Sequence, residues 1–187
     1  MNGDMGVTGT PGTGKKSVSE LLATKLGLEP SSLNELAREF RALRPTTGEV
    51  DTDALARCLS RPDRRSNTLY FGHLLPYVLG RKSLTKVVVL RCEPAVLKAR
   101  LASRGYPPKK LIGDVEAELI GLVSSDSFRV FGGAKTFEFD TTYTSPEEAA
   151  TSIAGSLREK WRPRRRIDWT ENYDSGPKLR KLFSTDH

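Results

Sequence analysis

The sequence predicts an α/β fold with a mainly parallel sheet. Apolar and β-branched runs that suit strands alternate along the 187 residues with segments of helical periodicity. The clearest strand is KVVVLR, residues 86–91, whose β-branched run suits a parallel strand buried on both faces. A glycine-rich turn over residues 9–14 joins the first predicted strand to the first predicted helix. Apolar residues make up 37% of the chain, which is enough to build the core of one ordinary domain.

The first half of the chain predicts two strands and three helices. The first helix carries apolar side chains at i, i+3, i+4 and i+8 from Val18 and ends before Gly27. Ser32 is a suitable N-cap for the second helix, and Asp51 or Thr52 can cap the third. The predicted elements are a strand over 5–8, helices over 15–26, 33–43 and from 51 or 52 to 59, and a strand over 68–71.

The second half continues the alternation and then changes in composition. After the strand over 86–91, Pro94 begins a helix to about Ser103, and an apolar stripe from Val115 to Val123 predicts another helix. TFEF, residues 136–139, predicts the last strand, and a helix follows over 146–161. Residues 162–187 are basic, contain two prolines and show little periodicity, so we interpret them as a basic tail that can form an extended arm.

Charge and composition indicate which kinds of partner and environment suit the protein. The net charge is +7, and from Arg158 onward nine Lys and Arg face five Asp and Glu. Such an excess favours contact with phosphates, from nucleotides to RNA, although a solvated basic surface is the alternative. No apolar run approaches the length of a membrane span. Cys58 and Cys92 lack metal-ligand or disulfide-framework spacing, so we expect a reduced, cytoplasmic protein.

Residues 9–15, GTPGTGK, match the G-x-x-x-x-G-K part of a P-loop, with a strand before and a helix after. Glycines let backbone N–H groups turn toward phosphate oxygens, the helix N-terminus adds its positive dipole end, and the lysine reaches the β and γ phosphates. The alternative is a plain glycine-rich turn. The predicted ATP-binding residues in this segment are Gly12, Thr13, Gly14, Lys15, Lys16 and Ser17.

Lys16 departs from the usual pattern, in which a hydroxyl at this position ligates Mg²⁺. An ammonium group cannot ligate a metal and repels it at short range. Ser17 is therefore the candidate metal ligand from this loop, directly or through water. Asp140, Asp51 and Asp53 are further candidates that the sequence does not rank.

Several segments together resemble one family. They are TGTPGTGK at 8–15, LARE at 36–39, RGYPPKKL at 104–111, GDVEAEL at 113–119 and SPEEAA at 145–150. The chain resembles the adenylate kinase isoenzyme six family in its archaeal form, nucleoside monophosphate kinase-like proteins of small ribosomal subunit maturation. The resemblance covers most of residues 5–160. It implies a P-loop kinase domain over 1–161, with an acceptor segment at about 31–55 and a short lid at about 103–113, followed by the tail.

The resemblance also implies roles for individual residues. Arg104 matches the lid arginine that touches ATP, in a short basic stretch with Lys109 and Lys110; a solvated turn is the alternative. Arg38 would bind the acceptor phosphate, or it is a surface helix residue. The family carries an Asp-x-His pair after its second core strand. Here His73 is kept, but Phe71 stands at the metal-linked Asp position.

Three functions follow. The first is transfer of the ATP γ-phosphoryl group to AMP, with Lys15, His73 and Arg104 as catalytic residues and ATP and Mg²⁺ as cofactors. The second, implied by the resemblance, is an ATPase that binds a small-subunit ribosomal protein and acts in 16S-type rRNA maturation. In the weak form of this alternative, the protein binds ATP but transfers the phosphoryl group slowly and acts mainly through its partner contacts. The third is RNA binding through the tail. Its candidate residues are Trp161, Arg162, Arg164, Arg165, Arg166 and Trp169.

Overall fold

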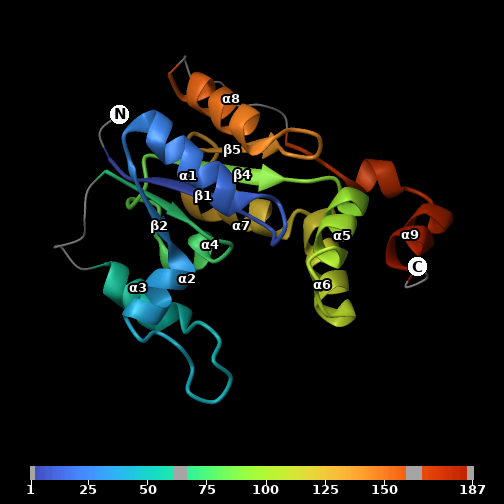
Figure 1. Ribbon diagram of the computed structural model, residues 1–187, viewed down its shortest axis with the longest axis horizontal. Helices are drawn as coiled ribbons and strands as arrows, with labels where there is room; N and C mark the ends of the chain where they lie inside the picture. The colour runs from blue at the N-terminus through green and yellow to red at the C-terminus, as the bar shows by residue number, and fades with distance from the viewer. Residues whose placement is uncertain (1–2, 61–66, 159–165, 185–187) are drawn as a thin grey trace.

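A five-stranded parallel sheet forms the centre of the protein, as the computed structural model shows for residues 3–60, 67–158 and 166–184 (Figure 1). The strand order is β2-β3-β1-β4-β5, and every pairing is parallel, which confirms the predicted fold class. The strands are β1 Met5–Gly9, β2 Glu29–Ser32, β3 Thr68–Phe71, β4 Lys86–Arg91 and β5 Thr136–Asp140.

Helices cover both faces of this sheet. Alternate residues of the buried strands point to opposite sides, so Val88 packs with α1 and α8, whereas Val87 packs with the opposite cluster, which includes residues of α3, α4 and α7. The α-helices are α1 Lys15–Leu26, α2 Leu33–Glu39, α3 Thr52–Leu59, α4 Leu75–Val78, α5 Pro94–Ala102, α6 Pro108–Leu119, α7 Leu122–Phe131, α8 Pro146–Arg158 and α9 Gly176–Phe183, and a 3₁₀ helix, η1, spans Thr170–Tyr173.

Two helix predictions differ from the structure at identifiable backbone positions. The helix predicted over 33–43 ends at Glu39, and Arg41 then adopts a positive φ of 53° that an α-helix cannot contain. The stripe from Val115 to Val123 belongs to two helices, because Gly121 separates α6 from α7 with a φ of 64°. The prediction used periodicity alone, so it extended one helix across the break between α6 and α7.

Strand β2 was missed by the sequence analysis. It contains Pro30, and its residues are exposed or half-buried at the edge of the sheet. Proline cannot donate a hydrogen bond to a neighbouring strand, so it is tolerated at an edge and hides the strand from pattern recognition.

The C-terminal segment, defined here as residues 166–184, packs on α5 and α6, so the interpretation of this part as an extended arm is wrong. Trp169 and Leu182 are buried in a cluster with apolar residues of α5 and α6, such as Leu97 and Val115. Leu179, Leu182 and Phe183 stand at i, i+3 and i+4, a helical period that the sequence analysis overlooked because it spans only one turn within a basic segment. Figure 1 shows α9 on the side of α5 and α6, away from the sheet.

Within the described residues, no helix has the length and apolar character needed to cross a membrane. Cys58 and Cys92 are free thiols.

Candidate active site

The turn between β1 and α1 has the backbone shape of a phosphate loop. Gly9 and Gly12 adopt φ angles of 141° and 91°, and added Cβ atoms would lie 2.3 Å from the carbonyl oxygen of Leu90 and 2.6 Å from Leu97 Cδ1. The N–H and Oγ1 of Thr13 both donate to the carbonyl oxygen of Thr10, at 3.3 and 2.9 Å. The curled loop leads directly into α1, whose N-terminus attracts anions.

Lys15 lies folded over this loop. Its Nζ donates to the carbonyl oxygen of Thr10 at 2.8 Å. Burial lowers the pKa of Lys15 from 10.5 to about 8, against the opposing charges of Glu118 and Asp114, and the nearby charge of Arg104 lowers it further. The ammonium group is still mainly protonated at pH 7. Burial leaves this cation poorly hydrated, and a bound phosphate would supply the hydrogen bonds and negative charge that water does not.

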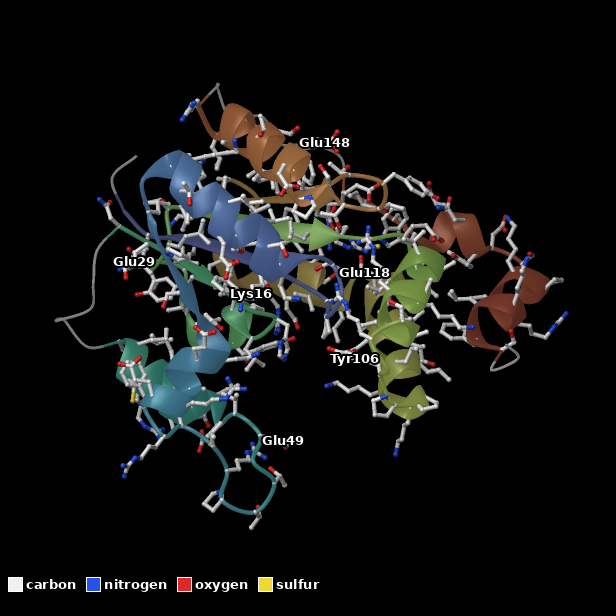
Figure 2. The ribbon with its side chains drawn as sticks, viewed as in Figure 1. Lys16, Glu29, Glu49, Tyr106, Glu118 and Glu148 are labelled. Carbon is white, nitrogen blue, oxygen red and sulfur yellow. The ribbon has the colours of Figure 1, made fainter. Side chains whose placement is uncertain are left out.

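The positions linked to metal binding offer few ligands. Lys16 is 71% exposed, with its Nζ 3.9 Å from Glu20 one helical turn later, and Ser17 is also exposed (Figure 2). Phe71 is buried in the core between the sheet and α1. Among the described residues, no three His, Cys, Asp or Glu side chains gather as a metal site would require.

The aspartates considered as metal ligands have other contacts or an exposed position. Asp51 accepts a hydrogen bond from the N–H of Ala54 at 2.8 Å and caps α3. Asp140 accepts one from the N–H of Thr142 at 2.8 Å, and Asp53 is exposed on α3. Asp51 is therefore a helix-cap residue and Asp140 a turn residue.

A cleft of about 560 Å³ lies between residues of the 34–52 region and Lys110 of α6. Figure 2 shows Glu49 and Tyr106 on opposite sides of it. Its lining includes two residues that the sequence analysis selected, Arg38 and His73. The full lining is Asn34, Arg38, Leu43, Arg44, Gly48, Glu49, Val50, Thr52, His73, Leu74 and Lys110.

His73 connects this cleft to the phosphate loop. Burial, together with the charges of Lys15 and Lys110, lowers its pKa from 6.5 to about 4. The imidazole is therefore neutral at pH 7, with one nitrogen able to donate and the other able to accept. His73 lines the cleft together with Lys110, and it is close enough to the loop residue Lys15 for that charge to lower its pKa.

Arg44 is a cleft residue that the sequence analysis did not select. It lies in RPTTGEV, residues 44–50, which was interpreted only as a loop. The loop folds back on itself, since Arg44 N–H donates to Glu49 O at 2.8 Å and Leu43 pairs with Val50. Arg44 stands next to a loop proline and belongs to no periodic pattern, so no sequence pattern favoured selecting it. The fold-back of the loop brings Arg44 into the same cleft lining as Arg38 and His73.

The predicted lid differs in its secondary structure. Helix α5 ends at Ala102 and α6 begins at Pro108, so only residues 103–107 form a connecting turn. Lys109 and Lys110 therefore lie in the first turn of α6, and the Lys110 Nζ lies 5.0 Å from the centre of the Tyr106 ring. Arg104 remains in the turn, exposed, at a place where its charge acts on Lys15.

Glu118, near the end of α6, is a buried carboxylate that the sequence analysis also missed (Figure 2). Its Oε2 accepts a hydrogen bond from Thr10 Oγ1 at 2.6 Å, and its Oε1 pairs with Arg91 Nε at 2.8 Å. A signal was available. Glu118 stands three residues after Val115 and one before Leu119, so it belongs to the stripe that faces inward.

The tail residues proposed to stack on RNA are corrected in part. Trp169 is 8% exposed, and its Nε1 donates to Glu118, so its ring is unavailable to a base. Arg166 is exposed but lies over the Phe128 ring at 4.8 Å and donates to Ser125. The other tail candidates, Trp161, Arg162, Arg164 and Arg165, lie outside the described residues.

Comparisons with known proteins agree with this architecture. A family model described as "AAA domain" matches residues 5–121. A protein of Thermococcus onnurineus named "Putative adenylate kinase" is 37% identical over 171 residues, covering 90% of this chain and 92% of that protein. One of the same name from Methanocaldococcus jannaschii is 27% identical, covering 89% and 93%.

The solved structures with a similar fold include kinases. Shikimate kinase from Bacteroides thetaiotaomicron has a TM-score of 0.58 at 16% identity and covers 85% of this chain and all of that chain. Deoxyadenosine kinase from M. mycoides, solved with bound dATP, has a TM-score of 0.54 at 14% identity and covers 83% and 100%. At these identities the likeness establishes a common fold of parallel sheet and flanking helices.

Proposed function

Because the chain belongs to the AAA-domain family and to the family of the archaeal proteins named as adenylate kinases, we propose that it transfers the γ-phosphoryl group of ATP to AMP. The chain is a nucleoside monophosphate kinase-like phosphotransferase. One observation carries the finer proposal. A cleft large enough for a nucleotide is lined by Arg38, Arg44 and Lys110, and His73, whose pKa the charge of the loop residue Lys15 lowers, lies in the same lining.

The loop and the turn before α6 form the donor side in this proposal. Backbone N–H groups of Gly12, Thr13 and Gly14 and the N-terminus of α1 would bind the β and γ phosphates. A phosphate would replace the Thr10 carbonyl as the partner of the Lys15 ammonium and raise its pKa. Arg104, in the exposed turn, would approach the γ phosphate from the other side.

Arg38 and Arg44 form the acceptor side. Both are exposed and line the cleft, where guanidinium groups can bind a phosphate bidentately. An acceptor phosphate oxygen would attack the γ phosphorus, form a new P–O bond and break the bond to the β-phosphate oxygen, which leaves with ADP. The protein's contribution is positioning and charge neutralisation by Lys15, Lys110 and the arginines.

ATP is the proposed cofactor, and Mg²⁺ commonly accompanies it. The described residues do not fit a metal held mainly by the protein, since Lys16 replaces a hydroxyl and Phe71 is buried. Ser17, exposed in the first turn of α1, is the residue whose hydroxyl we propose to reach a metal through water. Charge neutralisation is therefore assigned to the lysines and arginines of the cleft.

ATP hydrolysis is the second candidate, and the neutral His73 favours it. A neutral imidazole in the cleft lining, close enough to Lys15 to feel its charge, can accept a hydrogen bond from water and would orient that water toward the γ phosphate. The two reactions share the donor side and differ only in what occupies the cleft. AMP would then suppress hydrolysis by filling the position of the water.

A coupled assay separates these possibilities. The wild-type chain, supplied with Mg²⁺, ATP and AMP, should form ADP in an AMP-dependent manner, and Lys15→Ala should lose about 100- to 1,000-fold in rate. Turnover no higher than that of Lys15→Ala would refute the phosphotransferase proposal. If His73→Ala lowers phosphate release without AMP but spares the AMP-dependent rate, hydrolysis depends on His73; equal ATPase rates would exclude that role.

A part in small-subunit rRNA maturation, through a small-subunit ribosomal protein or through tail contacts with rRNA, is implied by the family resemblance alone. Replacing Arg162, Arg164 and Arg165 by Gln tests the tail without removing Trp169 and Leu182, which belong to the core. RNA affinity should fall and the salt dependence should flatten. Unchanged affinity and slope would leave the tail without this role.

A further inference from the structure

We propose that Glu118 is the positioning residue of the phosphate loop, and that the C-terminal segment supports it through Trp169. This inference rests on the proposed binding of ATP at the loop. Neither residue belongs to the glycine-rich motif, and they lie 108 and 159 residues after Thr10 in the chain. The fold nevertheless places both within one chain of hydrogen bonds that ends on the loop.

Thr10 is the point at which this network meets the loop. Its hydroxyl donates to Glu118 at 2.6 Å, and its carbonyl oxygen accepts from Thr13 and from Lys15 Nζ. One residue thus fixes the curl of the loop and the resting position of the lysine. Thr10 is 1% exposed, so it has no water to replace a lost partner.

Glu118 is itself fixed from several directions. Its Oε1 accepts from Arg91 Nε at 2.8 Å, from the N–H of Cys92 at 3.0 Å and from Trp169 Nε1 at 3.1 Å. Its Oε2 accepts the Thr10 hydroxyl. Both carboxylate oxygens therefore accept hydrogen bonds, and Oε2 accepts the one that holds the loop. A carboxylate bound in this way cannot rotate without leaving several buried donors unpaired.

Arg91 completes the buried core of the network. Its guanidinium pairs with Glu118 and with Glu138, and all three side chains are 2% exposed. Glu138 accepts from Ser124 and from the N–H of Ile167, so it holds α7 and the C-terminal segment but makes no contact with the loop. Glu138 is therefore a matched control: it has the same cationic partner and similar burial without the hydrogen bond to Thr10.

Trp169 closes the network from the C-terminal segment. Its ring is buried with residues of α5 and α6, and the guanidinium of Arg91 lies 6.0 Å from its centre. The indole N–H is one of three donors on the Glu118 oxygen. Losing it should loosen Glu118 less than a direct change at Glu118 or Thr10.

The Thr10 hydroxyl is tested by a pair of variants that differ mainly in one group. Thr10→Val keeps the branched shape and loses the hydroxyl, whereas Thr10→Ser keeps the hydroxyl. In calorimetric titration with ADP, we expect Thr10→Val to weaken binding about tenfold and Thr10→Ser to remain within about twofold of wild type. Equal ADP affinity for both variants would overturn the proposal.

Glu118→Gln and Glu138→Gln form the second pair. We expect both to lower the unfolding temperature, but only Glu118→Gln should weaken ADP binding, by about tenfold, and raise KM for ATP more than KM for AMP. Trp169→Phe should give a smaller effect in the same direction. A loss for Glu138→Gln as large as for Glu118→Gln, or equal rises in both KM values, would show a general structural role and refute the inference.

The Thr10→Val/Glu118→Gln double variant should bind ADP about as weakly as either single variant, because both changes remove the same interaction. Multiplied losses would contradict that coupling. Failure of this inference differs from failure of the proposed function. If wild type binds no ADP, the proposed function is wrong; if wild type binds and all variants bind equally, only the role of Glu118 is wrong.

Discussion

The two sides of the cleft are built differently. On the proposed donor side, the loop is held by Glu118 and Arg91, both 2% exposed and hydrogen-bonded in several directions. On the proposed acceptor side, Arg38 and Arg44 are exposed, and they project from a short helix and from the loop that follows it. The loop thus has a rigid support, whereas the two arginine side chains are adaptable.

The difference reflects what each side must recognise. Phosphate binding by backbone N–H groups needs a fixed curve, because a main-chain shift of a fraction of an ångström misaligns several donors together. Arginine side chains can reach an acceptor from several rotamers, and their exposure lets a nucleotide enter and leave. We therefore expect changes on the donor side to combine losses of stability and function, and changes on the acceptor side to affect acceptor binding alone.

The largest effect should come from removing the support of the donor side. Deleting residues 166–187 exposes the surface that Trp169 and Leu182 bury, so the free energy of unfolding should fall by about 3 to 6 kcal/mol. Urea denaturation measures this loss. A deletion variant with unchanged stability and unchanged ADP affinity would show that the segment does not support the donor side.

Arg38→Ala and Arg44→Ala sharpen the acceptor side of the comparison. Each should raise KM for AMP about 10- to 100-fold, since a charge-assisted hydrogen bond to phosphate is lost. KM for ATP and the unfolding temperature should stay near wild type, because both side chains are exposed. Steady-state kinetics with each nucleotide varied in turn checks this, and a matching rise in KM for ATP would contradict the division.

His73, in the lining of the cleft, should make stability depend on pH. Its folded pKa of about 4 lies below the usual 6.5, so the unfolded chain binds the proton more readily. Its contribution is fully present above pH 6.5 and is lost as pH falls toward 4. His73→Gln should reduce the drop in unfolding free energy between pH 7 and 4 by about 1 to 3 kcal/mol. An identical drop in both proteins would exclude this origin.

Lys16 should give the smallest effect. It is exposed on the donor side, with a single 3.9 Å ion pair to Glu20, so Lys16→Ser should change the unfolding free energy by less than about 0.5 kcal/mol. The new hydroxyl should lower the Mg²⁺ concentration needed for half-maximal rate, because a hydroxyl can ligate the ion. Unchanged Mg²⁺ dependence would show that a residue at position 16 does not reach the metal.

Local patterns predicted the parts of the fold that local chemistry fixes. The bounds of β3 and β4 and of α1 agree with the residues predicted for them, because short runs rich in β-branched or aromatic residues and an apolar stripe ended by Gly27 leave few alternatives. The missed elements each break a local rule. Strand β2 contains Pro30 at an edge, and Gly121 divides a stripe that continues in register on both sides.

The site divides in the same way. The sequence by itself determined the glycine-rich loop and Lys15, because curling a backbone around phosphate needs those residues in consecutive positions. Only the tertiary structure decided that Arg44 joins Arg38 in the lining of the cleft, that Trp169 is buried, and that Glu118 holds Thr10. Those contacts join residues far apart in the chain, and no local spacing encodes which distant segments the packing of a sheet and its helices will bring together.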